Sequence, residues 1–151
     1  MKRIIHLSLI LPAAAAILTG CTQNNGDISP WFGYWRMTSL TIDGKPDPDY
    51  SGNITWSFQS NIVFINLNLP HHEYDDGVGT WSSDGTILTL DYTHSHDQGN
   101  YEYLYTPPAV LRLPDDHPVD FTITRQTGRR TDLRRTLADG AVMECKLEKV
   151  Y

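Results

Sequence analysis

The chain contains 151 residues, of which 40% are hydrophobic and 20% are charged, and its formal net charge is −6 at pH 7. This length and hydrophobic content suit a single globular domain with one core. The acidic balance argues against binding to nucleic acid and against electrostatic attachment to anionic lipid.

Residues 1–20 have the pattern of a secretory signal peptide. Lys2 and Arg3 form a positively charged start, and the run from Ile4 to Leu18 carries no charge. The run is shorter than the roughly 20 apolar residues that a membrane-spanning helix requires. We therefore expect residues 1–20 to be absent from the mature protein.

The signal segment ends in Leu18–Cys21, whose sequence Leu-Thr-Gly-Cys resembles the bacterial lipobox. The resemblance implies that diacylglycerol is attached to the thiol of Cys21, which becomes the first residue of the mature protein. The alternative is an ordinary signal peptide with a chance cysteine at the cleavage site. Lipid chains on Cys21 would anchor the protein to a membrane without spanning it. Lipidation also leaves Cys145 as a single thiol, so no intramolecular disulfide can form.

Residues 21–30 are polar and lack periodicity, which suits a flexible tether between the lipid and a folded domain. Thr22 follows the lipidated cysteine. In enteric bacteria an Asp at that position retains a lipoprotein at the inner membrane, so Thr22 favours the outer membrane. We therefore expect a lipid-anchored protein of the cell envelope.

From residue 31 onward, short runs rich in β-branched and aromatic residues alternate with turn residues. Ile54, Trp56 and Phe58, for example, alternate with polar residues, which is the period-2 pattern of a half-buried strand. Residues 109–113 follow paired prolines and suit one helical turn. The predicted strands cover residues 32–40, 53–59, 62–69, 78–82, 86–92, 101–105, 119–124, 130–137 and 141–151.

Short turns at residues 60–61, 83–85, 127–128 and 139–140 join consecutive runs, which indicates antiparallel neighbours in a meander. A long meander avoids exposed edges by closing on itself. We therefore predict an all-β fold for residues 31–151. It should be an antiparallel meander closed into a barrel of about eight strands, with at most one short helical turn.

The first predicted strand opens with Gly33-Tyr34-Trp35, which resembles the Gly-x-Trp signature of the lipocalins. The runs 53–59 and 141–149 are similar to those of lipocalin-like lipoproteins common in Bacteroidales. The resemblance implies an up-and-down barrel whose base is closed by Trp35. In classical lipocalins an arginine from near the last strand packs over that tryptophan. Here the last strand offers Lys149, and the strand before it offers Arg134 and Arg135.

Aromatic residues supply candidates for a ligand site, because small-molecule sites are mostly apolar with a few polar groups. A barrel of this size can hold one small ligand or can fill its interior with side chains, and both alternatives stay open. The candidate ligand-binding residues are Trp56, Phe58, Trp81, Tyr92, Tyr101 and Tyr103.

His94 and His96 would face the same side of an extended segment, a spacing by which strands present two imidazoles to zinc or copper. No third ligand is fixed by the sequence, so they are weak metal candidates. Neither a nucleophile motif nor a phosphate-binding loop is present in the sequence, and we predict no enzymatic activity and no cofactor.

Two functions follow from these observations. In the first, a membrane-anchored lipocalin-like barrel binds a small apolar ligand in the cell envelope. In the second, a non-catalytic module with a filled core docks an envelope protein or a glycan complex. The sequence names neither the ligand nor a protein partner.

Overall fold

The computed structural model describes residues 29–93 and 107–150, and within them all regular structure except two short 3-10 segments is β-strand. The 3-10 segments are η2 (Pro70–His72) and η4 (Ala109–Leu111). The strands are β1 (Gly33–Ile42), β2 (Lys45–Pro46), β3 (Ile54–Gln59), β4 (Ile62–Asn68), β5 (Tyr74–Ser83), β6 (Ile87–Asp91), β7 (Val119–Gln126), β8 (Arg130–Thr136) and β9 (Val142–Lys149).

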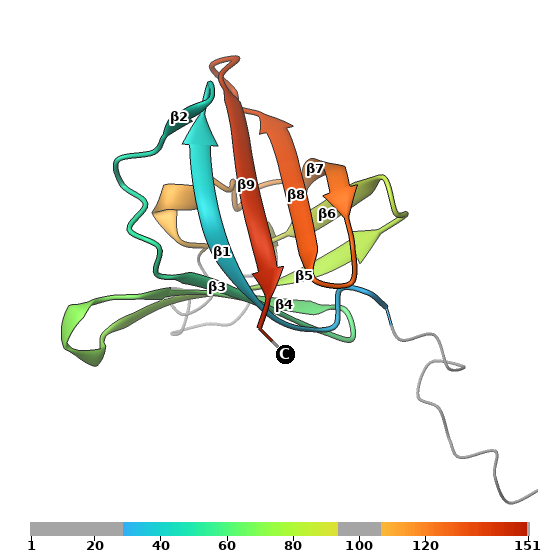
Figure 1. The fold of residues 1–151 in the computed structure, drawn as a ribbon, viewed down its shortest axis with the longest axis horizontal. Coiled ribbons are helices and arrows are strands. Elements are labelled where there is room, and N and C mark those ends of the chain that lie inside the picture. The colour runs from blue at the N-terminus through green and yellow to red at the C-terminus, as the bar shows by residue number, and fades with distance from the viewer. Residues whose placement is uncertain (1–28, 94–106, 151) are drawn as a thin grey trace, which may run out of the picture.

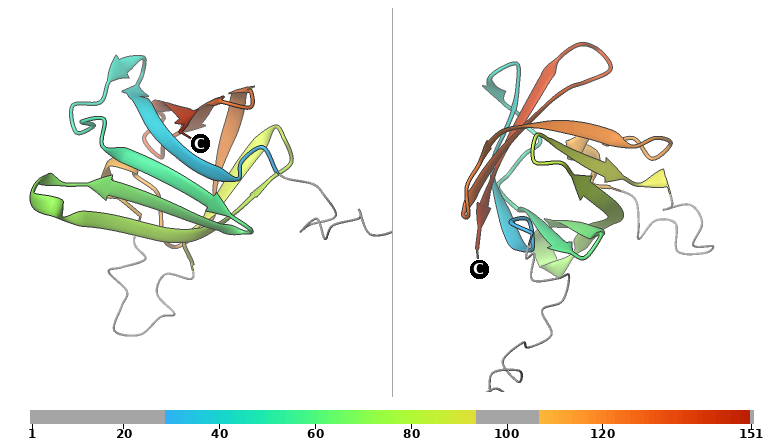
Figure 2. Two further views of the ribbon diagram at one scale, coloured as in Figure 1. Left: turned by 60° about the horizontal axis from the view of Figure 1, so that its bottom comes forward. Right: turned by 90° about the vertical axis from the view of Figure 1, so that its right-hand side faces the viewer.

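All nine strands form one antiparallel sheet in the order β2-β1-β3-β4-β5-β6-β7-β8-β9, and β1 also pairs with β9 (Figure 1). This last pairing runs from Trp35↔Lys149 to Ile42↔Met143. It closes β1 and β3–β9 into an eight-stranded barrel, to which β2 adds a two-residue strand beside β1. The strands curl around a common interior (Figure 2). The predicted fold class is therefore confirmed.

Strand alternation places apolar side chains inside the barrel. On β3, Ile54, Trp56 and Phe58 are buried while the residues between them are partly exposed, as the sequence pattern predicts. On β9, Met143, Cys145 and Leu147 are buried in the same way. Burial raises the pKa of the Cys145 thiol to about 12, so the thiol stays protonated and uncharged. Cys145 therefore packs as a small apolar residue of the core.

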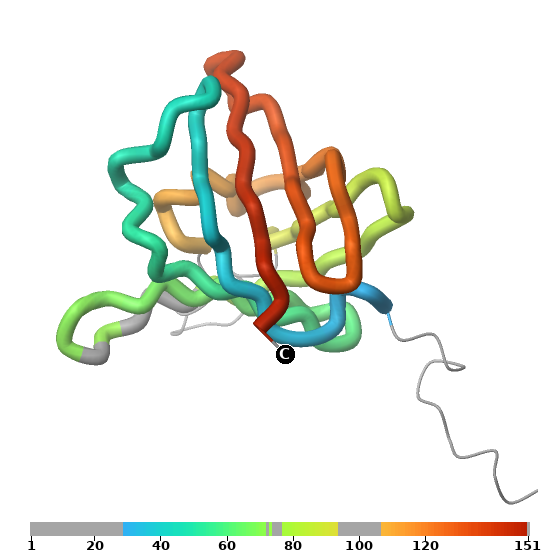
Figure 3. The backbone as a smooth tube through the Cα atoms, in the orientation of Figure 1, coloured from blue at the N-terminus to red at the C-terminus, as the bar shows by residue number. Residues whose placement is uncertain are grey.

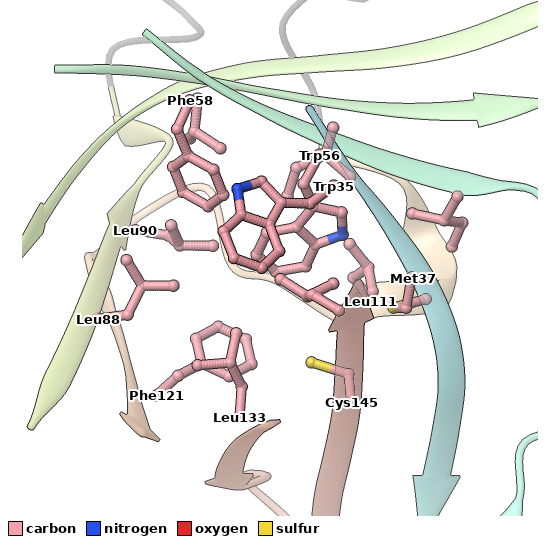
Figure 4. Packing of buried hydrophobic residues seen from close by; sticks show 14 of the residues in the cluster. Trp35, Met37, Trp56, Phe58, Leu88, Leu90, Leu111, Phe121, Leu133 and Cys145 are labelled. Carbon is pink, nitrogen blue, oxygen red and sulfur yellow. The ribbon is translucent and has the colours of Figure 1, made fainter. Parts of the chain in front are cut away.

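The core fills the space between the strands (Figure 4). Its large side chains are each at most 2% exposed, and they include Trp31, Trp35, Trp56, Phe58, Tyr92 and Phe121. Every described strand and core residue lies within residues 31–149. The chain from residue 22 to residue 151 therefore contains the complete barrel and its core, which is what independent folding of a domain requires.

One end of the barrel is closed by the start of β1, as the resemblance predicts for Trp35. The indole Nε1 of Trp35 donates to the carbonyl oxygen of Trp31 at 2.7 Å. Lys149 Nζ lies 5.2 Å from the centroid of the Trp35 ring and donates to the carbonyl oxygen of Pro30 at 3.2 Å. We call this end the base; the first described residues and the end of β9 both lie there (Figure 3).

Several strand boundaries differ from the predicted ones by one or more residues, and for two of them the strand pairing gives the reason. β5 begins at Tyr74, four residues before the predicted start at Val78, because the backbone of residues 74–77 pairs with residues 65–68 of β4. Ladder hydrogen bonds do not depend on apolar side chains, so a polar segment can extend a strand. β7 continues to Gln126 by pairing with β8 across an irregularity between Ile123 and Arg125. The predicted run 101–105 lies outside the described residues.

The predicted helical turn at residues 109–113 is present as η4, shorter by two residues. Within the described residues no helix is long and apolar enough to cross a membrane. The predicted signal peptide, residues 1–20, and most of the predicted tether lie outside the described part of the chain.

Candidate functional site

The end of the barrel opposite the base is crossed by two connections, and we call it the mouth. Residues 43–53 link β1 to β3, and residues 107–118 are the described part of the link between β6 and β7. Pro108 is extended and leads into η4, where Leu111 enters the core at 1% exposure. The second connection therefore covers part of the barrel's interior.

An ion pair ties the two connections together. η4 is capped at its C-terminal end by Arg112, whose backbone is left-handed (φ 50°). Arg112 Nη1 donates to Oδ2 of Asp47 at 2.6 Å, and Oδ1 of Asp47 accepts the backbone N–H of Asp49 at 2.9 Å. Burial acts to raise the pKa of Asp47, but these two hydrogen bonds and the charge of Arg112 outweigh it, so the pKa lies below its usual value.

Arg135 is a charged residue on the inner face of β8. Alternation along β8 places it on the same side as the buried Thr131 and Leu133. Its Nη2 donates to the carbonyl oxygen of Arg112 at 2.6 Å, and its guanidinium carbon lies 5.5 Å from the centroid of the Phe121 ring. Its Nε is buried and has no hydrogen-bond partner within the described residues. Desolvation by burial lowers the pKa of Arg135, although a guanidinium keeps its proton at neutral pH.

Beside Arg135, the mouth contains a partly open pocket of about 570 Å³, within the range typical of small-molecule sites. Its apolar wall comes from Pro114, Pro118, Val119, Leu137 and Ala138. Its polar groups come from Arg112, His117, Asp120, Arg135, Thr136 and Asp139. The pocket thus combines an apolar surface with charged groups of both signs.

The structure brings three of the predicted ligand-binding aromatics together, at the base and away from the mouth. The ring centroids of Trp56 and Phe58 are 6.2 Å apart, and those of Phe58 and Trp81 are 5.2 Å apart. Trp56 and Phe58 are fully buried, whereas the partly exposed Trp81 lines a second groove of about 370 Å³ together with Ser60, Asn61 and others. None of these three residues lines the mouth pocket.

Tyr92, the fourth predicted residue, is buried next to Gly79, and burial raises the pKa of its hydroxyl. Tyr101 and Tyr103 lie outside the described residues, so their placement at a ligand site stays a prediction. Tyr92 Oη and Trp56 Nε1 have no hydrogen-bond partner within the described part of the protein. Buried polar groups ordinarily have a hydrogen-bond partner, so this hydroxyl and this indole N–H are two donors that could still bind an acceptor inside the barrel.

The weak metal candidates His94 and His96 also lie outside the described residues. In the ranges 29–93 and 107–150, three or more His, Cys, Asp or Glu side chains do not come together in an arrangement that could hold a metal ion. His117 is exposed and its Nδ1 lies 2.6 Å from Oδ1 of Asp116, its neighbour in sequence.

Sequence reasoning assigned no functional role to Asp47 or Arg112. It considered Arg135 as a partner for Trp35 and as one of several arginines near the turn at residues 127–128 that could meet an acidic glycan, a phosphate or a partner protein. A signal for Asp47 was available, because an aspartate between Pro46 and Pro48 sits where an Asx turn forms readily. The inward position of Arg135 could also be read from alternation along residues 131–135. The pairing of Asp47 with Arg112 links residues that are 65 positions apart, and no local pattern predicts it.

An eight-stranded antiparallel meander barrel with a tryptophan-closed base and a pocket at its mouth is the architecture of ligand-binding barrels of the lipocalin type. The lipocalin-like domain family matches residues 32–107 of the chain, and the protein belongs to that family. The predicted resemblance is thereby confirmed.

Two solved structures share the fold. A lipocalin-like protein from Bacteroides uniformis is 13% identical, with a TM-score of 0.57 over 80% of this chain and 99% of the other. An uncharacterized protein from Bacteroides eggerthii is 14% identical, with a TM-score of 0.56 over 79% and 98% of the two chains. No curated protein has a sequence that matches this chain.

Proposed function

We propose that this protein is a lipoprotein of the cell envelope that is anchored through Cys21 and binds a small, largely apolar ligand at the mouth of its barrel. The mouth pocket is the observation that carries this proposal. Its volume of about 570 Å³ fits a small molecule, and its wall of prolines and aliphatic side chains offers apolar contact. A binding function also suits the lipocalin-like fold, although fold alone does not determine function.

The position of the base supports the anchored arrangement. β1 starts at the base, so a lipid attached N-terminal to residue 29 would hold that end of the barrel toward the membrane. The mouth lies at the opposite end and would face away from the lipid surface. Such an orientation leaves the pocket accessible to a ligand that arrives from the aqueous side.

The proposal is tested by native mass spectrometry of residues 22–151 purified from the producing cells. A bound species of defined mass and stoichiometry is the expected result. Substituting the pocket wall with Leu137→Asp should release that species, whereas Leu69→Asp, at an exposed position outside the pocket, should retain it. Retention of the ligand by both variants would place the site elsewhere in the barrel.

The packed interior favours a second candidate function. Because the core side chains Trp35, Trp56 and Phe58 are at most 1% exposed, the barrel is filled around them and offers its surface for contacts. In this alternative the protein docks an envelope protein or a glycan, and the groove beside Trp81 is a suitable place. A protein that carries no small molecule and gains none on addition of apolar compounds would favour this function.

A further inference from the structure

We propose that Arg135 makes the mouth pocket selective for a monocarboxylate with an apolar body. This inference rests on the proposed ligand-binding function and specifies the chemical class of the ligand. Arg135 would receive the carboxylate, and the aliphatic wall formed by Val119 and Leu137 would contact the apolar part of the ligand.

The arginines of β8 differ in how their charge is compensated. The outward-facing arginines of this strand have acidic neighbours, since Arg130 Nη2 lies 2.9 Å from Oε1 of Glu148 and Arg134 Nε lies 4.0 Å from Oε1 of Glu144. Arg135 faces inward and has no ion-pair partner among the carboxylates of the described residues. Arg135 is half-buried, so its charge is partly desolvated, and a desolvated charge is ordinarily paired. A ligand carboxylate would supply the missing counter-charge.

Two uncharged partners hold the guanidinium of Arg135 in place. The carbonyl oxygen of Arg112 accepts a hydrogen bond from Nη2, and the Phe121 ring lies against the guanidinium. Both partners are uncharged, so they fix the orientation of Arg135 and leave its charge uncompensated. Nε has no hydrogen-bond partner in the described part of the chain. A carboxylate can accept two parallel N–H groups from one guanidinium, and an orientation fixed in advance favours that geometry.

Arg112, the other arginine of the pocket, does not compete for this role. Its Nη1 is paired with the buried carboxylate of Asp47, so much of its charge is already compensated. Its carbonyl oxygen, in turn, holds Arg135 in place. Arg112 is therefore a positioning residue, and Arg135 is the group that contacts the ligand.

The acidic groups of the pocket restrict the class of anion. Asp120 and Asp139 are exposed and lie at its rim, where Asp120 Oδ1 accepts from Thr89 Oγ1 and Asp139 Oδ1 accepts from the backbone N–H of Ala141. These carboxylates disfavour small anions of high charge, such as phosphate. Solvent screens exposed charges more strongly than a half-buried guanidinium, so a single carboxylate at Arg135 remains favourable.

The test compares octanoate with octanamide, which has the same chain and a neutral head group. Titration calorimetry on residues 22–151 should show octanoate binding about 10-fold or more tightly than octanamide, because a hydrogen bond to a charged group is stronger than one to a neutral group. Arg135→Gln should remove this preference and leave octanamide binding unchanged. Arg134→Gln alters the adjacent arginine on the outer face and should leave both affinities unchanged.

The outcomes separate this inference from the proposed function. Equal affinities of the wild-type protein for the two compounds would overturn carboxylate selectivity while leaving ligand binding intact, and this comparison does not depend on the folding of any variant. A preference for octanoate that persists in Arg135→Gln, with unchanged near-UV circular dichroism, would also overturn the role of Arg135. Failure of both compounds to bind would overturn the inference together with the proposed mouth site.

Discussion

Arg112 and Asp47 are 65 residues apart in the sequence, yet Arg112 Nη1 donates to Asp47 Oδ2 at 2.6 Å across the mouth of the barrel. The carboxylate side chain is fully covered, while the arginine side chain keeps 38% of its surface exposed. The pair ties together two connections that are otherwise held separately, the first by the hydrogen bond from Tyr50 to the carbonyl oxygen of Met37 and the second by the buried side chain of Leu111. The carbonyl of the same arginine also positions Arg135, so the ion pair and the pocket share one network.

Replacing Asp47 with Asn should destabilise the protein by about 1–3 kcal/mol, because a buried hydrogen bond between charged groups is lost while Arg112 can turn toward water. Chemical denaturation monitored by tryptophan fluorescence measures this change. Asp49→Asn alters an exposed neighbour and should have no measurable effect. Equal stabilities of the two variants would show that the pair does not hold the mouth.

The same carboxylate predicts a loss of stability in acid. Its pKa is lower in the folded protein than the reference value of 3.8, so the folded state binds fewer protons than the unfolded chain in that range. The stabilisation is complete above the unfolded pKa and is lost as the pH falls through the folded one. Thermal unfolding between about pH 5 and pH 2 should therefore be less pH-dependent in Asp47→Asn than in the wild type. Parallel curves would contradict the lowered pKa.

Gly79 on β5 should not tolerate a side chain. A Cβ atom there would lie 2.7 Å from the backbone oxygen of Asp91 and 3.0 Å from the Tyr92 ring. Gly79→Ala should cost about 1–3 kcal/mol through overpacking, measured as a lower thermal midpoint. At Gly128 a Cβ meets nothing within 4 Å, so Gly128→Ala is the matched control and should leave the midpoint nearly unchanged.

Cys145 should be unreactive in the folded protein. Its side chain is buried, and burial raises its pKa to about 12, so almost no thiolate exists at pH 8. In residues 22–151, Ellman's reagent should detect one thiol per chain in denaturant and close to none in native buffer. Rapid labelling without denaturant would reveal frequent opening of the β8–β9 region.

The proposed anchor predicts that Cys21→Ser removes the protein from the membrane fraction. Without the thiol no diacylglycerol can be attached, and the lipid chains are the proposed anchor. Fractionation and detergent partitioning of the full chain, compared with Cys145→Ser, measure the effect. Unchanged partitioning of Cys21→Ser would contradict the lipoprotein proposal.

The fold could be predicted from the sequence because its pattern is local. Alternation in residues 53–59 and 141–149, together with tight-turn residues between runs, indicates antiparallel neighbours, and closure follows from the number of strands. The base could be predicted through Gly33-Tyr34-Trp35, and the structure places Lys149 over the Trp35 ring. The start of β5 was missed because residues 74–77 pair through their backbone.

The mouth could not be predicted in the same way. The Asp47–Arg112 pair, and the hydrogen bond from Arg135 to Arg112, depend on how two long connections pack over the barrel. Sequence reasoning favoured aromatic residues for the ligand site, and the structure places two of them, Trp56 and Phe58, among the buried side chains of the core. Large aromatic rings are buried both when they line a ligand cavity and when they fill a core, so composition alone does not distinguish the two.

The pairing of β1 with β9 also bears on when the protein can fold. Trp35 meets Lys149 across almost the whole length of the domain, so the barrel cannot close until its last strand has been synthesised. Contacts between such distant residues slow folding, since a long loop must be ordered before they form. If the chain is exported as proposed, this delay would help to keep the polypeptide unfolded during its passage across the membrane.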